Sequence, residues 1–424
     1  MTNDDLLTKA KKYRWIIFWT LSFGYLLVYF HRLCPAVVAV DMMRDLNATG
    51  ALTGFLGAAY FYPYAAMQLP AGLLSDSWGP RNTITLFFVI AVAGSIILGL
   101  APTVFIAILG RTMVGLGVAM LFVPTMKILA EWFHAKEFAV MTGILMAVGG
   151  LGSLVAATPL VWLSSWIGWR MSFIAVGVFT LVLAALVWII VRDRPADMGW
   201  PSPAAEPSQA RPAEIKLLEG VGKVLSTPHF WPVAIWFFFN CAIFFSFGGL
   251  WGGPYLIQVY GYSKSQAGQI LSMLAFGMII GSPLLSYVST SVLRSRKKVI
   301  ILSSIVVLIL SACLAFMTER IPMGGHYAIC FGLGLFSSAI VVIGFTTNKE
   351  LFPVQMAGTA TGLVNLFPFA GGAVFQPILG YMLEQQGKVD GAFTPAGYQQ
   401  SFLVLFFCGV IALGASFFIK ETIE

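Results

Sequence analysis

The sequence predicts an all-α integral membrane protein with about twelve transmembrane helices in two six-helix, pseudo-symmetric halves. Composition, run length and an internal repeat predict this class. Of the 424 residues, 58% are hydrophobic and only 10% are charged, whereas soluble domains carry about 25% charged residues. Apolar runs recur along the chain, each with the roughly 20 residues that a helix needs to cross a bilayer. They lack the alternation of apolar and polar residues that is typical of membrane β-strands.

Each predicted span is an apolar run bounded by polar, Gly-rich or Pro-rich segments. The first run is too long for a signal peptide and lacks a small-residue cleavage site, so we expect it to remain as an anchor. The predicted spans are 13–35, 49–71, 81–100, 103–130, 138–163, 169–191, 230–257, 265–288, 298–317, 325–347, 357–383 and 399–419.

The two blocks of six spans repeat each other. A constant shift of 219 residues carries Glu131 to Glu350 and Gly143 to Gly362 without a gap. A charged, Pro-rich stretch separates the blocks. We therefore predict an N-terminal bundle, a cytoplasmic linker and a C-terminal bundle, with a substrate site between the bundles near the membrane midplane. Their predicted limits are 1–191, 192–229 and 230–424.

The net charge of +7 indicates topology and not nucleic-acid binding, because the basic residues gather in alternate loops. By the positive-inside rule, the basic loops and both termini are cytoplasmic. The five cysteines lie in apolar stretches without CxxC or His clusters, so we expect buried thiols and neither a metal site nor a cofactor. The basic residues include Lys9, Lys11, Lys12, Arg14, Arg192, Arg194, Arg211, Lys216, Lys223, Arg294, Arg296, Lys297 and Lys298.

Two motifs carry a family resemblance. GLLSDSWGPR, from Gly72 to Arg81, resembles the signature between helices 2 and 3 of the major facilitator superfamily, and RTMVGLG, from Arg111, resembles the start of its helix 4. The resemblance implies two bundles that rock about a central cavity lined by helices 1, 4, 7 and 10. The helix-5 antiporter signature is not cleanly present in GILMAVGGLGSLVAATP, which weakens an assignment to drug–proton antiport.

Tyr25, Tyr29 and Arg32 share one face of the first predicted helix, since their spacing is four and three residues. This region resembles the organic-anion branches of the superfamily, in which a helix-1 arginine meets a phosphate or carboxylate. A guanidinium suits such a group in a dry site. The alternative is an arginine that reaches the outer membrane interface and has no substrate role.

Further candidates lie on several spans. Arg111 either ties helix 4 to helices 1 and 2 or contacts the substrate. The shift of 219 carries Arg32 to Trp251, so we expect Trp251 to close the opposite wall of the cavity. The aromatic candidates could equally be packing residues. The neutral candidates are Tyr60, Tyr64, Gln68, Trp236, Asn240, Trp251, Asn348 and Asn365.

A cytoplasmic gate is the expected role of charged residues at helix ends. Asp76 and Arg81 lie on the signature turn, and Glu131 and Glu350 occupy matching positions in the two halves. We expect the glutamates to pair with Arg81 and with the basic cluster that contains Arg296. The spacing of Lys127 and Glu131 predicts an i,i+4 pair.

No Asp or Glu lies deep in any span, so the fixed charge of the cavity is expected to be positive. We therefore predict a monomeric secondary transporter for a small organic anion, a carboxylate or phosphorylated metabolite, in the bacterial inner membrane. The alternative cargo is neutral or zwitterionic: an amino acid, a nucleoside or a drug. Coupling is open between exchange and protons, the latter carried by His31, Asp41 or the substrate itself.

The sequence lacks the features that an enzyme, a primary pump or a nutrient sensor would be expected to have. An enzyme would need a nucleophile, metal cluster or acid pair within the spans. A primary pump would need a Gly-x-x-x-x-Gly-Lys-Ser/Thr loop, which is not present. A nutrient sensor would typically add a signalling extension, for which the short linker and the tail KETIE offer no room.

Overall fold

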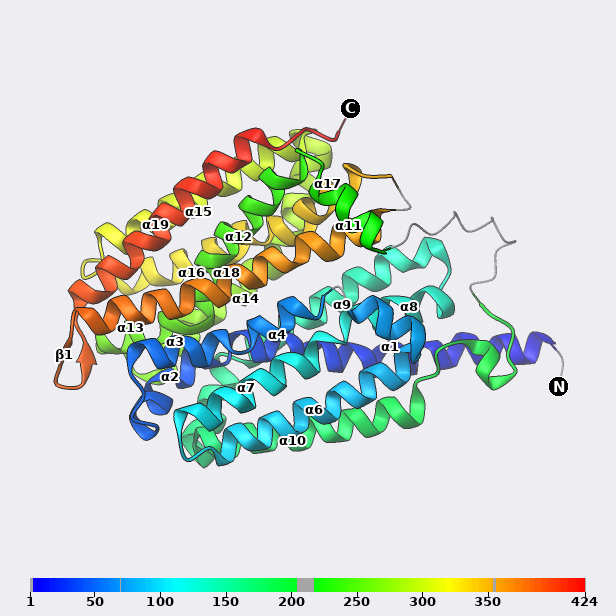
Figure 1. The fold of residues 1–424 in the computed structure, drawn as a ribbon, viewed down its shortest axis with the longest axis horizontal. Helices are drawn as coiled ribbons and strands as arrows, with labels where there is room; N and C mark the ends of the chain where they lie inside the picture. Colours follow the sequence, from blue (N-terminus) through cyan, green and yellow to red (C-terminus); the bar gives the residue numbers. More distant parts are fainter. Residues whose placement is uncertain (1–2, 69, 204–216, 354–355, 424) are drawn as a thin grey trace.

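The computed structural model describes residues 3–68, 70–203, 217–353 and 356–423. Arg211 and Lys216 of the predicted linker lie outside the described residues. The described chain is almost entirely helical and forms two bundles, an N-terminal half (α1–α10) and a C-terminal half (α12–α19) (Figure 1). Both chain ends lie toward one face, called here the terminal face, and the short β1–β2 hairpin lies toward the other, called the hairpin face.

The second crossing is broken into three short helices, whereas the sequence predicts one span over 49–71. Pro63 lies in the first turn of α4 and Pro70 begins α5, because proline lacks the N–H that a helix interior needs but is tolerated in a first turn. The first half of the chain forms α1 (Asn3–Leu33), α2 (Pro35–Asp45), α3 (Gly50–Ala58), α4 (Phe61–Ala66), α5 (Pro70–Ser77), α6 (Pro80–Leu100), α7 (Val104–Ala119), α8 (Phe122–Trp132) and α9 (Ala135–Val155).

The fifth and sixth crossings meet at Gly168. α10 runs from Thr158 to Ile190, but Gly168 has φ of +76°, a conformation that glycine adopts without steric cost. Residues 158–167 therefore prolong the fifth crossing, and residues 169–190 form the sixth. A short 3₁₀ turn, Pro195–Met198, and the linker helix α11 (Leu217–Leu225) follow.

Two π-helical turns, Phe247–Trp251 and Ile340–Gly344, interrupt crossings of the C-terminal half, and a third, Val288–Val292, ends the crossing that α14 forms. The hairpin pairs Lys388 with Phe393 and Val389 with Ala392. The remaining elements are α12 (Phe230–Ser246), α13 (Gly252–Gln258), α14 (Lys264–Tyr287), α15 (Arg296–Phe316), α16 (Met323–Ser337), α17 (Phe345–Glu350), α18 (Ala357–Gln385), β1 (Lys388–Val389), β2 (Ala392–Phe393) and α19 (Pro395–Phe418).

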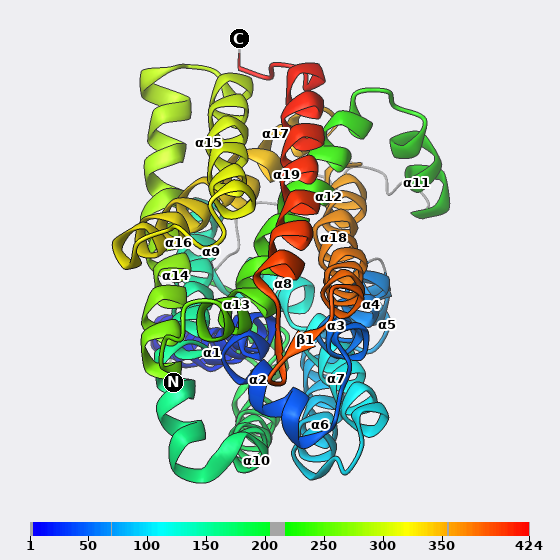
Figure 2. The same ribbon diagram turned by 90° about the vertical axis from the view of Figure 1, so that its left-hand side faces the viewer.

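Ten helical stretches of the described chain are long and apolar enough to cross a membrane. The broken second crossing and the fifth crossing, whose apolar helix Val140–Val155 is shorter, bring the arrangement to twelve. Figure 2, turned by 90°, shows the two bundles side by side, with α1 and α6 in one and α15 and α19 in the other. The predicted fold class is confirmed.

The two halves touch closely at the hairpin face. A Cβ on Gly54 of α3 would lie 2.5 Å from the carbonyl oxygen of Gln376 in α18, so only glycine permits this approach. The backbone N–H of Gly50 donates to a carboxylate oxygen of Glu384 across the same boundary, at 2.6 Å. Asp41 of α2 forms an ion pair with Lys264 of α14. These contacts separate the space between the halves from the hairpin face.

Candidate functional site

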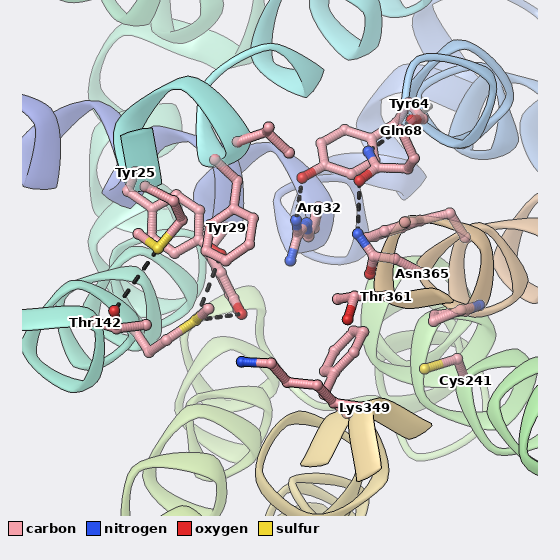
Figure 3. Close-up of a pocket in the computed structure, with 18 of the residues that line it drawn as sticks. Tyr25, Tyr29, Arg32, Tyr64, Gln68, Thr142, Cys241, Lys349, Thr361 and Asn365 are labelled. Carbon is pink, nitrogen blue, oxygen red and sulfur yellow. Dashed lines mark hydrogen bonds between the residues drawn. The ribbon is translucent and has the colours of Figure 1, made fainter. Parts of the chain in front are cut away.

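A cavity of about 830 Å³ lies between the two halves. Its wall continues to residues at the terminal-face ends of helices, such as Gly72 in α5 and Lys349 in α17. Figure 3 shows side chains from both halves pointing into it. The N-terminal wall comes chiefly from α1, α4, α8 and α9, and the C-terminal wall from α12, α17 and α18.

Arg32 is the charged group of the N-terminal wall. It is 7% exposed, and one of its terminal N–H groups donates to the hydroxyl of Tyr64 at 2.7 Å. Its guanidinium carbon lies 4.3 Å from the ring centre of Tyr29, 5.0 Å from that of Tyr64 and 4.9 Å from that of Phe369. Aromatic faces attract a cation at such distances.

No carboxylate pairs with Arg32 within the described part of the chain, and its Nε is buried without a hydrogen-bond partner. Burying a charge without an opposite charge is unfavourable. The aromatic rings offset only part of that cost. Arg32 is therefore chemically suited to bind an anion that enters the cavity.

Tyr25 and Tyr29 extend this wall along α1, as the helical spacing predicts. Their rings meet edge to face with centroids 5.4 Å apart, and the hydroxyl of Tyr25 donates to the sulfur of Met146 at 3.5 Å. Gly149 of α9 faces both rings, since a Cβ there would lie 2.9 Å from Tyr29. Because Gly149 lets α9 approach α1 closely, α9 holds both tyrosine rings in place.

The two halves share hydrogen bonds and ring contacts in the cavity wall. The side-chain amide of Asn365 in α18 donates to the side-chain oxygen of Gln68 at 2.6 Å, and the amide of Gln68 donates to the carbonyl of Tyr64 at 2.9 Å. Tyr64 also packs on Phe369, with ring centroids 4.3 Å apart. The predicted candidates Tyr64, Gln68 and Asn365 thus lie together beside Arg32.

Lys349 is a cavity residue that the sequence analysis missed. It lies near the end of α17, and its ammonium group points into the cavity (Figure 3). The neighbouring Glu350 accepts two hydrogen bonds of 2.7 Å from Arg296 and a third of 2.6 Å from Thr422. The signal in the sequence that could have revealed Lys349 was its position directly after Asn348, a candidate substrate-binding residue.

Two other predicted candidates bond to nearby backbone outside the cavity. Arg111 is 1% exposed and donates to the carbonyl of His31 at 3.0 Å, which ties α7 to α1. Tyr60 donates to the carbonyl of Val28 at 3.1 Å. Both arrangements match the structural alternative for these residues.

Trp251 does not line the cavity, contrary to expectation. Its indole N–H donates to the carbonyl of Gln376 at 3.0 Å, inside the contact between the halves. Trp236 bonds to Ser304 at 2.8 Å. Asn240 and Asn348 are fully buried away from the cavity, and neither side-chain amide has a partner among the described residues.

The two predicted proton carriers occupy different settings. His31 is fully buried behind the cavity wall, and its ring nitrogens have no hydrogen-bond partner among the described residues. Asp41 accepts from Lys264 at 2.5 and 2.6 Å, and Arg44 lies 3.6 Å from the same carboxylate. Asp41 therefore joins the two halves at the hairpin face.

Among the described residues, each ion pair of a predicted gate residue lies within one half. Asp76 pairs with Lys127, which corrects the expected pair between Lys127 and Glu131. Glu131 forms no ion pair among the described residues. Glu350 does pair with Arg296, a member of the basic cluster that the sequence singles out.

In the part of the chain that the structure describes, Arg81 does not pair with a predicted gate glutamate either. Its backbone N–H donates to Asp193 at 2.7 Å, and its side chain lies over the ring of Trp188, 4.2 Å from the centroid. Burial raises the pKa of Asp193. The signature turn is thus fastened to the end of α10, a contact that spacing along the sequence does not reveal.

No group of three or more His, Cys, Asp or Glu side chains in the described chain lies close enough to hold a metal ion. All five cysteines are free thiols. The chemistry of the site therefore rests on two cations, aromatic rings and neutral polar groups.

Comparison with known proteins agrees with the fold. Over 396 residues the chain is 24% identical to the hexuronate transporter of Escherichia coli K12, covering 90% of each chain. It is 23% identical to a probable hexose phosphate transport protein of Chlamydia muridarum, covering 97% of this chain and 92% of the relative. It is 22% identical to a probable galactarate/D-glucarate transporter of Bacillus subtilis, covering 92% and 90%.

A solved structure shares the fold. It is a bacterial homologue of the human lysosomal transporter Spinster, in an inward-facing and unoccupied conformation, with 19% identity, 96% coverage of both chains and a TM-score of 0.76. Residues 21–376 match the family model described as Major Facilitator Superfamily. That match covers most of the chain, so the protein is a multi-pass membrane transporter and not an enzyme, and it belongs to the major facilitator superfamily.

Proposed function

We propose that this protein is a secondary active transporter of a small organic anion, a carboxylate or a phosphorylated metabolite. One observation carries the proposal: Arg32 is buried in the cavity wall beside aromatic rings and has no carboxylate partner among the described residues. The names of the three relatives support it, since hexuronates, hexose phosphates and aldarates are all organic anions.

The binding chemistry follows from the groups around Arg32. The guanidinium donates to Tyr64 through one nitrogen, which leaves N–H groups for two oxygens of a carboxylate or phosphate. The cavity is lined by no Asp or Glu among the described residues, so a cationic ligand would find no fixed charge of opposite sign there. Tyr29 and Phe369 exclude water from the guanidinium and so strengthen its attraction for an anion.

The state of the structure fits one half of a transport cycle. Contacts between the halves close the hairpin face, and the cavity wall reaches the terminal face. The positive-inside pattern favours cytoplasmic termini, so we assign this state as open to the cytoplasm in a bacterial inner membrane. Rocking the halves would open the hairpin face, break the Asp41–Lys264 pair and close the terminal face.

The carboxylates of the gate act within the halves in this state. The pairs Asp76–Lys127 and Arg296–Glu350 hold helix ends together inside each bundle. We propose that they exchange partners across the boundary when the terminal face closes. A single chain supplies every group of the cavity described above, so the proposed functional unit is a monomer.

The experiment is uptake into proteoliposomes that contain the purified protein. Glucuronate, glucarate, glucose 6-phosphate, glucose, an amino acid and a nucleoside are compared as cargo. The proposal predicts uptake of at least one anion and none of the neutral compounds, whereas uptake confined to neutral or zwitterionic cargo would contradict it. An imposed proton gradient, compared with internal unlabelled anion, separates proton coupling from exchange.

A further inference from the structure

Lys349 gives the cavity a second cationic group, on the wall opposite Arg32. The two belong to different halves, Arg32 to α1 and Lys349 to α17, and both line the same cavity. Figure 3 shows the Lys349 ammonium directed into the space that Tyr29 and Arg32 face. No acidic side chain lies in that wall among the described residues.

Neighbouring acids do not neutralise Lys349. Glu350, the next residue, points elsewhere because successive residues of a helix face directions about 100° apart. Its carboxylate accepts two bonds from Arg296 and one from Thr422. Lys349 forms no ion pair with any described residue, whereas Lys127 of the opposite half is paired with Asp76.

Neutral polar groups, Thr361 and Asn365, lie on the wall near both cations (Figure 3). Thr346 lies one turn before Lys349 on the same helix, and Thr361 and Asn365 share one face of α18. Hydroxyl and amide groups at such positions can bind the hydroxyl groups of a sugar-like ligand. The wall therefore combines a cation at each side with hydrogen-bonding groups near both.

We infer that the ligand is an organic dianion, with one negative charge bound by Arg32 and the other by Lys349. This inference rests on the proposed anion transport and goes further, because a single carboxylate would satisfy only one of the two cations. Charges of one sign in a cavity with low-dielectric walls raise the local concentration of the opposite charge. Lys349 is thus the residue that sets the preference for dianions over monoanions.

This inference is tested with a matched series of ligands that have the same carbon skeleton but differ in their number of charges. Glucose, glucuronate and glucarate carry no, one and two carboxylates on the same six-carbon chain, and glucose 6-phosphate carries its two charges on one phosphate. Binding to the purified protein is measured by titration calorimetry at pH 7.5. We expect glucarate or glucose 6-phosphate to bind about tenfold or more tightly than glucuronate, the size of one charged hydrogen bond.

Variants of Lys349 test whether this residue causes the preference for dianions over monoanions. Lys349→Gln should weaken glucarate binding about tenfold and glucuronate binding by less, because Arg32 still binds the single carboxylate of glucuronate. The variant should therefore lose most of the preference for the dianion. Lys349→Arg should retain the preference. Lys223→Gln is the matched control, since Lys223 is an exposed linker lysine paired with Glu219 and lies outside the cavity.

The outcomes separate this inference from the proposed function. Equal binding of glucuronate and glucarate, or an unchanged dianion preference in Lys349→Gln, would overturn the inference and leave anion transport intact. Binding confined to glucose, or no binding by any anion, would contradict the proposed function and this inference together. If glucose 6-phosphate is the one dianion that binds the wild type more tightly than glucuronate does, the two cations bind a single phosphate group. If glucarate is the one that does, the two cations bind two separated carboxylates.

Discussion

Asp41 and Lys264 join the two halves of the protein on the face opposite the chain termini. Both carboxylate oxygens of Asp41 accept from the Lys264 ammonium, at 2.5 and 2.6 Å. The side chain of Asp41 is 10% exposed and that of Lys264 is 43% exposed. The pair exists only while the hairpin face is closed, so it stabilises the state that is open toward the terminal face.

Asp41→Asn is predicted to shift the protein toward the state that is open at the hairpin face. A partly exposed pair contributes about 0.5–1 kcal/mol, which corresponds to a shift of roughly twofold to fivefold. Spin labels at Pro102 and Glu319, in exposed loops of different halves, report the separation by pulsed electron resonance. Lys264→Met should give the same shift and the double variant no more than either, since one interaction is lost in all three. A larger effect in the double variant would show that the two residues act separately.

Gly54→Ala is predicted to push α3 away from α18. The new Cβ would lie 2.5 Å from the Gln376 carbonyl oxygen and 2.6 Å from the Cα of Pro377, both backbone atoms that cannot turn aside. The distance between labels at Pro102 and Glu319 should therefore increase. Gly143→Ala is the control, because nothing lies within 4 Å of its Cβ position. The same distance distribution in both variants would contradict the close contact.

Gly79→Ala is predicted to destabilise the N-terminal half by about 1–3 kcal/mol. Gly79 has φ of +83°, and a Cβ there would lie 2.5 Å from a carboxylate oxygen of Asp193. The change is measured as a lower midpoint of thermal unfolding in detergent. Gly72→Ala tests the same signature at a position with open space around the Cβ, so its midpoint should stay close to that of the wild type. Equal midpoints for the two variants would argue against strain at Gly79.

The interaction of Glu137 with Arg14 leads us to predict that the stability of the folded protein depends on pH. Two hydrogen bonds from Arg14, of 2.7 and 2.9 Å, lower the pKa of Glu137, which lies before the apolar part of α9. A lowered pKa in the folded state gives stability that is present above the ordinary value of 4.5 and is lost as pH falls below it. The glutamate is 36% exposed, so the contribution is at most about 1 kcal/mol.

Thermal unfolding of the wild type and Glu137→Gln between pH 7 and pH 4 measures this contribution. The variant should unfold at lower temperature at pH 7, and the difference should shrink toward pH 4. A difference that stays constant with pH would show that the carboxylate charge is not involved.

The sequence predicted the fold because helix length, polarity and the internal repeat are local properties of the chain. It also placed Tyr25, Tyr29 and Arg32 on one side of α1, since helical periodicity fixes their directions, and all three line the cavity. Lys349 was missed because a lysine beside a glutamate at a helix end resembles an ordinary charged helix terminus. Its direction depends on how α17 packs, which is a tertiary property.

The repeat was a poor guide to individual side chains. Trp251 corresponds to Arg32 by the shift of 219 but lies in the π-helical turn Phe247–Trp251. Such a turn adds a residue to the helix and changes the direction of the side chains near it. Lys127 pairs with Asp76 of another helix, so the i,i+4 spacing to Glu131 was also misleading.

The affinity of the Arg32→Gln variant for glucuronate tests the central claim most directly. Glutamine keeps polar groups at this position but removes the buried positive charge. We predict that binding by titration calorimetry falls about tenfold to a hundredfold, the effect of one to two charged hydrogen bonds, and that Arg32→Lys retains part of it. If Arg32→Gln binds glucuronate as tightly as the wild type, Arg32 is not the anion-binding residue and the account is wrong.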